Sequence, residues 1–258
     1  MTKTLFVSDI HLSHIKAPAT KTFFNWLNTT ARGSDAVYIL GDLFEIWVGD
    51  DVPSTLTTQV IQHLRALHDS GTPIFYIHGN RDFLIGEAFA KAAGITLLPE
   101  HVVIDIYGTP TLIMHGDTLC TQDTEYQAFR KKTRAPEFAQ WGLAKPIWQR
   151  NLIAKYLRLR SHLRTRYLSK KNQTYMIMDV DPATVTRMME TYHVQHLIHG
   201  HTHRPAVHEL TVNELPATRT VLGSWEKKAS MLVCTPQYQQ LIFFAITAKP
   251  TNQSVNKN

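Results

Sequence analysis

Seven side chains that could bind a metal ion through oxygen or nitrogen lie in short motifs along the chain. Aspartate, asparagine and histidine supply all of them, and cysteine supplies none. They are Asp9 and His11 (D-x-H), Asp42 (G-D), Asn80 (G-N), His115 (H-G), and His201 and His203 (G-H-T-H). Carboxylate, amide oxygen and neutral imidazole without thiolate suit Mn²⁺, Fe²⁺ or Zn²⁺ at a catalytic site better than a structural zinc.

This donor set predicts a centre with two divalent ions that acts on phosphate esters. One aspartate can bridge two ions about 3.5–4 Å apart, the spacing of two-metal phosphoesterases, and the ions supply a hydroxide nucleophile at neutral pH. A single aspartate after a strand is more often a turn or cap residue than a ligand, but an ordered series of such motifs is not explained that way. His196 and His199 are expected to be packed or supporting histidines.

Each motif directly follows a short apolar run that we predict to be a buried strand. The runs cover residues 5–7, 36–40, 74–77, 112–114 and 197–198. Loops beyond the carboxyl ends of strands in an open α/β sheet converge on one crevice. Residues two apart in an extended segment point the same way, so Asp9 with His11, and His201 with His203, are expected to face one site.

Helical patterns separate the first strands. Apolar residues recur with a period near 3.6 in residues 19–30, 55–70 and 86–93, so the chain begins β-α-β-α-β, which is typical of a sheet with helices packed against it. After His203 the pattern changes to strands at 206–212, 219–223, 230–234 and 240–246, and this half is expected to be antiparallel.

Length and composition are those of one globular α/β protein. The chain has 258 residues, of which 43% are hydrophobic, enough to bury a full core. Its two cysteines, Cys120 and Cys234, exclude a disulfide scaffold and a zinc ribbon, and they fit a reducing compartment. With no secretory signal pattern and no apolar run of about 18 residues, we expect a cytoplasmic protein.

The positive charge is concentrated in one segment, which we predict to be an inserted helical cap. Residues 125–172 hold 13 Lys or Arg and 2 Asp or Glu, a balance of +11, whereas the rest of the chain has a balance of −5. Prolines at 136 and 146 are expected to separate shorter helices from a long one. An ordinary helical hairpin with a solvated basic face is the alternative, but the segment lies between two of the ligand motifs, which favours a cap.

The long basic helix carries one apolar stripe. Trp148, Leu152, Tyr156, Leu159 and Leu163 follow one another at spacings of 4, 4, 3 and 4 residues. The predicted domains are therefore a core of residues 1–124 and 173–248, the cap at 125–172, and a polar tail at 249–258 that frays.

The motif series D-x-H, G-D-x-x-E, G-N-R-D, H-G-D and G-H-T-H resembles the calcineurin-like metallophosphoesterase superfamily over residues 4–246. The resemblance implies an α/β fold of two mixed sheets between helices. It also implies two metal sites that share Asp42 as a bridge. One site would use Asp9, His11, Asp42 and His203, and the other Asp42, Asn80, His115 and His201.

Longer stretches of sequence narrow the resemblance to one family within the superfamily. Arg81 stands where many superfamily members have a histidine that acts as general acid. An arginine does not donate its proton readily, but it holds a phosphate by two hydrogen bonds. The strings SDIHLS (8–13), GDLFEIW (41–47), MHGDTLC (114–120), IMDV (177–180) and HGHTHRP (199–205) are similar to the UDP-2,3-diacylglucosamine diphosphatase family of the lipid A pathway.

This second resemblance implies a substrate and a set of roles. The family cleaves the substrate diphosphate with two Mn²⁺ ions, by attack of a metal-bound hydroxide on the phosphorus nearer the uridine, and releases UMP and 2,3-diacylglucosamine 1-phosphate. Asn80 and His201 would be catalytic. Substrate contacts are expected from Asn80, Arg81, Asp123 and His201. The family also has a lysine before I-M-D-V, but an ungapped match does not place it in this sequence. Lys170 and Lys171 are therefore both candidates for that position.

The partners implied are an acylated UDP-sugar lipid and, through the basic rim of the cap, the anionic cytoplasmic face of the inner membrane. A monomer is expected. The pI of about 9.3 raises nucleic acid as another partner, but a basic patch alone is weak evidence, and the apolar stripe fits lipid better.

Two other functions keep the fold and change the activity. A nucleotide diphosphatase or cyclic nucleotide phosphodiesterase would use the same metal centre, although Glu45 and Arg81 argue mildly against it. A binding module on an inactive fold would have lost metal ligands, and none is missing here.

Overall fold

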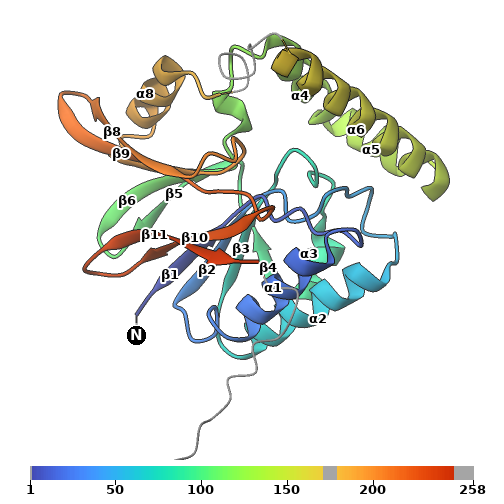
Figure 1. Ribbon diagram of the computed structural model, residues 1–258, viewed down its shortest axis with the longest axis horizontal. Helices are drawn as coiled ribbons and strands as arrows, with labels where there is room; N and C mark the ends of the chain where they lie inside the picture. Colours follow the sequence, from blue (N-terminus) through green and yellow to red (C-terminus); the bar gives the residue numbers. More distant parts are fainter. Residues whose placement is uncertain (1, 171–178, 247–258) are drawn as a thin grey trace, which may run out of the picture.

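Two mixed sheets form the centre of the molecule. The computed structural model describes residues 2–170 and 179–246 (Figure 1). One sheet has six strands in the order β11-β10-β1-β2-β3-β4, and the other has five in the order β5-β6-β7-β9-β8. The strands are β1 Thr4–Val7, β2 Ala36–Leu40, β3 Ile74–Ile77, β4 Ile95–Leu97, β5 His101–Ile106, β6 Thr109–Met114, β7 His196–His199, β8 Ala206–Val212, β9 Leu215–Val221, β10 Lys228–Cys234 and β11 Gln239–Ala245. The predicted α/β class with two mixed sheets flanked by helices is confirmed.

The first sheet is parallel from β1 to β4, and antiparallel where β10 joins β1 and β11 joins β10. Helices α1 (Ala17–Asn28), α2 (Thr55–Asp69) and α3 (Glu87–Ala93) pack on its outer face (Figure 1). The core beneath them is centred on Trp225, which is fully buried and meets Phe23 and Trp26 at ring-centroid distances of 5.7 and 6.0 Å. Helix α1 begins two residues before the predicted span, because Pro18 can occupy a first turn where no amide donor is needed.

The strands after His203 pair antiparallel with one another as expected, β8 with β9 and β10 with β11. Strand β9 also runs parallel to β7, which precedes His203. The alternation of apolar and polar residues does not encode strand direction, so this pairing could not be read from spacing. Helix α8 (Pro182–Thr191) covers this sheet through Val185 and Met189. Phe6, Leu40 and Ile113 belong to a third apolar cluster formed between the two sheets.

Three helices stand apart from the sheets. They are α4 (Thr124–Thr133), α5 (Pro136–Leu143) and α6 (Ile147–Lys170), and a short 3₁₀ turn, η1 (Asp117–Leu119), leads into them. Pro136 occupies the first turn of α5. Figure 1 shows α6 along the outer edge of the molecule, away from both sheets. Within the described residues, every helix is too short or too polar to cross a bilayer.

Candidate metal centre

Five of the seven predicted ligands lie in a left-handed backbone conformation. Asp9 and His11 follow β1 with φ of 53° and 54°, Asp42 follows β2 with φ of 55°, and His201 and His203 follow β7 with φ of 68° and 57°. The segment Asp9–His11 is therefore not extended, contrary to the expectation from its two-residue spacing. Such conformations are costly for residues with a side chain and persist mainly at functional sites. Here they turn each loop back so that its polar side chain faces the crevice.

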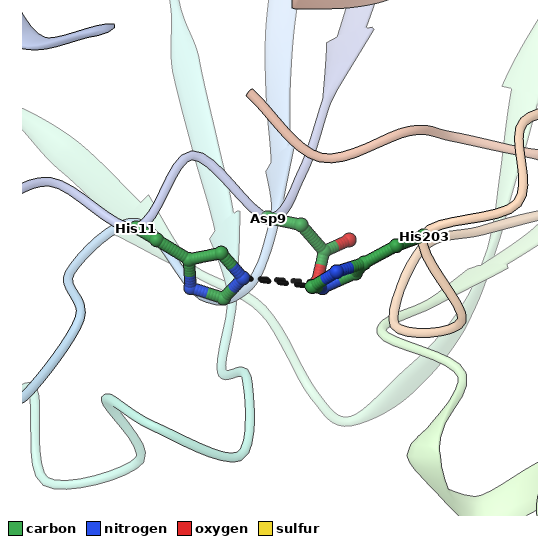
Figure 2. Close-up of side chains that lie close together, drawn as sticks. All are labelled: Asp9, His11 and His203. Atoms are coloured by element: carbon green, nitrogen blue, oxygen red, sulfur yellow. Dashed lines mark hydrogen bonds and ion pairs between the residues drawn. The ribbon is translucent and has the colours of Figure 1, made fainter. Parts of the chain in front are cut away.

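Asp9, His11 and His203 form the first group of ligand atoms. Figure 2 shows the three side chains pointing toward one another from loops that are far apart in the sequence. His11 Nε2 lies 3.2 Å from His203 Nε2, and His203 Nε2 lies 3.2 Å from Asp9 Oδ1. One donor atom from each residue falls within 4.8 Å of the others.

Asn80, His115 and His201 form the second group. Asn80 Oδ1 lies 3.0 Å from both His115 Nε2 and His201 Nδ1, and these two ring nitrogens are 3.3 Å apart. Donor atoms that share one ion at about 2.1 Å are separated by about 3 Å when they are at right angles. The second ring nitrogen of His115 lies 2.8 Å from the Leu40 carbonyl oxygen, to which it donates, so Nε2 is left with a lone pair for a metal.

Asp42 lies between the two groups. Its Oδ2 is 3.8 Å from His11 Nδ1, and its Oδ1 is 3.9 Å from His115 Nε2. Each oxygen thus faces one group, as a bridging carboxylate requires. Asp9 is also within reach of the second group, because it clusters with Asp42 and His115 as well as with His11 and His203.

The residues present fit divalent metal ions. Asp9 Oδ1 and His11 Nδ1 are buried and lack a hydrogen-bond partner among the described residues, an arrangement that costs free energy unless something else binds these atoms. Burial lowers the pKa of His11 well below its usual value, and lowers that of His201 to about 3, so both imidazoles are neutral and able to ligate.

The carboxylates leave negative charge that a cation would balance. Burial raises the pKa of Asp42 to about 6, against the opposing effect of His115 and Arg81. For Asp9, burial also raises the pKa, but His203, His115 and His11 outweigh it and hold the value well below the usual range. Among the described residues, no Lys or Arg nitrogen lies within 4.0 Å of Asp9 in an ion pair, and its charge-bearing neighbours there are histidines.

Backbone contacts that no spacing argument identified hold the ligand loops together. Asp82, fully buried, accepts hydrogen bonds from the amides of Asp42, Phe44 and Gly79 at 3.1–3.2 Å. Ser8 Oγ donates to Asp9 Oδ2 at 2.6 Å, and the His201 amide donates to the same oxygen at 2.8 Å. Asp82 and Ser8 belong to the motif strings noted in the sequence. The sequence did not indicate that Asp82 accepts hydrogen bonds from backbone amides, or that Ser8 donates one to the Asp9 carboxylate.

Of the two other histidines, His199 supports the centre and His196 is remote from it. His199 is fully buried, its Nδ1 donates to the Gly200 carbonyl oxygen at 2.9 Å, and its Nε2 accepts from Arg219 at 3.1 Å. His196 pairs with Thr218 Oγ1 at 2.8 Å on the second sheet. Neither side chain belongs to the two ligand groups.

Arg81 lies at the edge of the centre in a cluster of charged groups around Glu45. Its Nη1 donates to Glu45 Oε1 at 2.7 Å, and its Nε lies 3.3 Å from Asp42 Oδ2. Arg158 of α6 binds the same Glu45 oxygen, and Lys16 Nζ lies 3.6 Å from the other. Three cations thus meet one carboxylate beside the candidate metal ligands.

Of the other predicted substrate-binding residues, Asp123 lies outside the charged cluster around Glu45. Asp123 is buried, its Oδ1 caps α4 by accepting from the Tyr126 amide at 2.9 Å, and both its oxygens accept from Arg164 of α6 at 2.7 Å. Lys170 is the last residue of α6, its side chain is outside the described part of the structure, and Lys171 is outside it altogether.

Arginines of α6, and the arginine that follows α4, attach the outer helices to the core. Besides the Arg164–Asp123 pair, Arg150 of α6 makes two bonds to Asp51, at 2.6 and 2.9 Å, and Arg134 donates to the Gly79 carbonyl oxygen at 2.8 Å. Much of the charge predicted to form a free basic rim is therefore used in ion pairs that hold the helices in place.

A cavity of about 220 Å³ lies between these helices and the core, beside Asn80 and Arg81. Its lining is mainly apolar, with basic groups from Arg158, Arg160 and Arg164. The apolar residues that line it include Trp47, Leu84, Phe129, Phe138, Ile153 and Leu157. The stripe from Trp148 to Leu163 is not among them, because it lies on the opposite face of α6.

Known proteins match both the fold and most of the chain. The family model of the calcineurin-like phosphoesterases matches residues 2–205. A protein from Enterobacter sp. (strain 638), named UDP-2,3-diacylglucosamine hydrolase, is 50% identical over 93% of this chain and 98% of its own. Proteins of the same name from Salmonella paratyphi B and Salmonella arizonae are 48% and 49% identical over 94% of this chain and 99% of theirs.

The family expected from the motif series is thereby confirmed. The matched region contains all seven predicted ligands, from Asp9 to His203. The relatives named as hydrolases match 93–94% of this chain, which is more than the family model covers. This chain is a hydrolase and belongs to the calcineurin-like phosphoesterase family.

Proposed function

We propose that this protein hydrolyses the diphosphate bond of UDP-2,3-diacylglucosamine, releasing UMP and 2,3-diacylglucosamine 1-phosphate, with two Mn²⁺ ions. The observation that carries the proposal is the position of the apolar cavity, which lies directly beside Asn80 and Arg81 at the candidate metal centre. A substrate with two acyl chains and a diphosphate needs such an apolar volume next to a charged site. The relatives named for this reaction support the same substrate.

The residues of the chain have separate tasks in this reaction. Two divalent ions, when bound, would supply a nucleophile from water and neutralise charge on the phosphorus oxygens. Asn80 and His201 face the reacting phosphate from the second ligand group, and Arg81 holds the diphosphate with its planar guanidinium. Because an arginine is a poor general acid, the leaving group must depart with little protonation, which a sugar 1-phosphate can do.

Arg81 and Arg158 are positioned to exchange one anion for another. In the structure both bind Glu45, and a diphosphate beside Asn80 would offer them stronger, bidentate acceptors. The apolar side chains of the cavity would exclude water from the acyl chains, and the favourable burial of those chains would hold the diphosphate against the centre.

Removal of metal gives the direct test. Enzyme stripped with EDTA is expected to release no UMP from UDP-2,3-diacylglucosamine, and addition of Mn²⁺ is expected to restore release. Mg²⁺ and Zn²⁺ at matched concentrations test the identity of the ion. UDP-glucose serves as the matched substrate without acyl chains. Equal turnover of UDP-glucose, or UMP release that survives stripping, would remove the lipid substrate or the metal dependence from the proposal.

Replacement of Arg81 by lysine is expected to lower kcat/KM by roughly 100-fold. Lysine keeps the positive charge but loses the planar fork that makes two hydrogen bonds to one phosphate. The rates of UMP release by the Arg81→Lys protein and by Arg187→Lys, an exposed arginine on α8, are compared under the same conditions. If both variants match the parent, the guanidinium geometry of Arg81 plays no part in the reaction.

A further inference from the structure

Helix α4 and the residue that follows it touch all three loops of the second ligand group, which carry Asn80, His115 and His201. The contacts are made to Gly79, to Asp117 and to the His201 ring itself. In the part of the chain that the structure describes, no hydrogen bond, ion pair or ring contact joins α4 to the first ligand group. Helix α4 is therefore connected to one ligand group and not to the other.

Tyr126, in the first turn of α4, covers the ring of His201. The two rings are stacked, with their centroids 6.0 Å apart and their planes at 28°. The hydrogen-bond contacts of the His201 ring among the described residues both involve Nδ1, which faces Asn80 and His115. A ligating imidazole is normally oriented by a partner of its second nitrogen. In this protein the aromatic face of Tyr126 is in a position to orient the ring instead.

Asp117 holds Tyr126 in place. This carboxylate is 1% exposed and lies two residues after His115. Its Oδ2 accepts from the Tyr126 hydroxyl at 2.7 Å and from Arg130 Nε at 2.8 Å. The backbone carbonyl oxygen of Asp117 accepts from the side chain of Gln127 at 2.8 Å. Three residues of α4 thus bind one residue of the His115 loop, and one of these bonds is strengthened by charge.

The end of α4 reaches the third loop. Arg134, directly after the helix, donates to the Gly79 carbonyl oxygen at 2.8 Å, one residue before Asn80. Its guanidinium also lies over the ring of Phe83, 5.0 Å from the centroid. A shift of α4 would therefore move the surroundings of all three ligands in the second group at once.

We propose that Tyr126 is a positioning residue that holds the His201 ring in its ligating orientation, and that α4 thereby couples the outer helices to the second ligand group. The inference rests on the metal centre of the proposed function, but not on the identity of the substrate. Tyr126 and Phe129 also line the cavity, so one wall of the cavity and one half of the metal centre are built on the same helix.

Titration of the EDTA-stripped, full-length protein with Mn²⁺ alone, followed by calorimetry, tests this role. The parent is expected to bind two ions. Tyr126→Leu removes the aromatic ring, and we expect it to bind one of the two ions roughly tenfold more weakly, as when other residues that orient a ligand are replaced, while the other ion binds as in the parent. Tyr126→Phe keeps the stack and loses only the hydroxyl, so it is expected to restore most of the lost affinity.

The dependence of the rate on Mn²⁺ gives a second measurement. With a soluble nitrophenyl phosphodiester as substrate, Tyr126→Leu is expected to reach half of its maximal rate at roughly tenfold higher Mn²⁺ than the parent. A general loss of structure would instead lower the rate at every Mn²⁺ concentration and shift the urea midpoint. The soluble substrate has no acyl chains, so loss of the cavity wall at Tyr126 does not enter this comparison.

Tyr192→Leu is the matched control. Tyr192 also lies beside a histidine, His101, with ring centroids 6.3 Å apart, but neither residue belongs to a ligand group. This protein is expected to bind both ions like the parent. Arg134→Gln removes the bond to the Gly79 carbonyl oxygen and tests the coupling from the other end of α4, whether or not Tyr126→Leu folds. It is also expected to weaken the binding of one ion.

The outcomes separate this inference from the proposed function. Equal Mn²⁺ binding by the parent, a folded Tyr126→Leu and Arg134→Gln would overturn the positioning role. Equal weakening in Tyr126→Leu and Tyr126→Phe would overturn the role of the stacked ring. A parent that binds fewer than two ions would contradict the metal centre of the proposed function itself. Failure to release UMP from the lipid substrate, with Mn²⁺ binding as expected, would count against the proposed substrate alone.

Discussion

Replacement of His115 by alanine is expected to lower the rate of hydrolysis by more than about a thousandfold. This side chain lies at the middle of the second ligand group, 3.0 Å from Asn80 Oδ1 and 3.3 Å from His201 Nδ1. Its loss removes a predicted metal ligand and leaves the Leu40 carbonyl oxygen without the bond it accepts at 2.8 Å. An ion that is lost or displaced no longer stabilises the charge of the transition state.

The measurement is the steady-state rate of UMP release, together with metal content by mass spectrometry after dialysis. His196→Ala is the matched control, because His196 is on β7, the neighbour of the strand that precedes His115, but its side chain bonds to Thr218 in the described contacts. A urea unfolding curve shows whether the His115 protein is folded. A folded variant that keeps its metal and its rate would refute the ligand assignment of His115.

Gly79→Ala is expected to destabilise the fold by about 3–5 kcal/mol and to abolish activity at the same time. A Cβ at this position would lie 2.1 Å from both the backbone nitrogen and Oδ1 of Asp42. The nitrogen is a backbone atom, and Oδ1 belongs to a buried side chain held by the Arg81 amide at 2.8 Å. The loops after β2 and β3 must therefore move apart, as in other overpacked buried sites. That movement would displace the carboxylate predicted to bridge the two ions.

The urea midpoint and the slope of unfolding measure the loss. Gly142→Ala is the control, because a Cβ there meets nothing within 4 Å. Gly142 is in helix α5, so alanine should leave stability unchanged or raise it by up to about 1 kcal/mol. If Gly79→Ala unfolds at the same urea concentration as the parent, the close approach of the two loops is not rigid.

The candidate metal ligands could be picked out from the sequence because each lies in a motif that directly follows a recognisable apolar run. The apolar run predicts the strand, and the glycine or polar pair after it marks the strand's carboxyl end, as at residues 36–42. The sheet topology then brings these carboxyl ends together. The left-handed backbone at Asp9, His11 and Asp42 was not predictable in this way. It depends on hydrogen bonds from distant loops, such as that from the Asp9 amide to the Gly41 carbonyl oxygen.

Residue spacing did not predict which side of α6 faces the cavity or which residues pair with its arginines. The stripe beginning at Trp148 was visible in the sequence, but so was a second apolar set that includes Ile153 and Leu157. Both faces of α6 satisfy a helical period, and only the three-dimensional contacts decide that the second set faces the cavity. The pairing of Arg164 with Asp123 was likewise hidden, because the two residues are 41 positions apart.

The position of β1 has a consequence for how the protein is made. This strand, near the amino terminus, pairs on one side with β2 and on the other with β10, whose residues are near the end of the chain. During synthesis, the side of β1 that pairs with β10 therefore stays uncovered, with three apolar residues out of four in the strand, until residues 228–234 have left the ribosome. Such edges invite pairing with other nascent chains. Production of this enzyme is thus most vulnerable to chaperone shortage and premature termination late in translation, when nearly all of the chain exists but the first sheet is not complete.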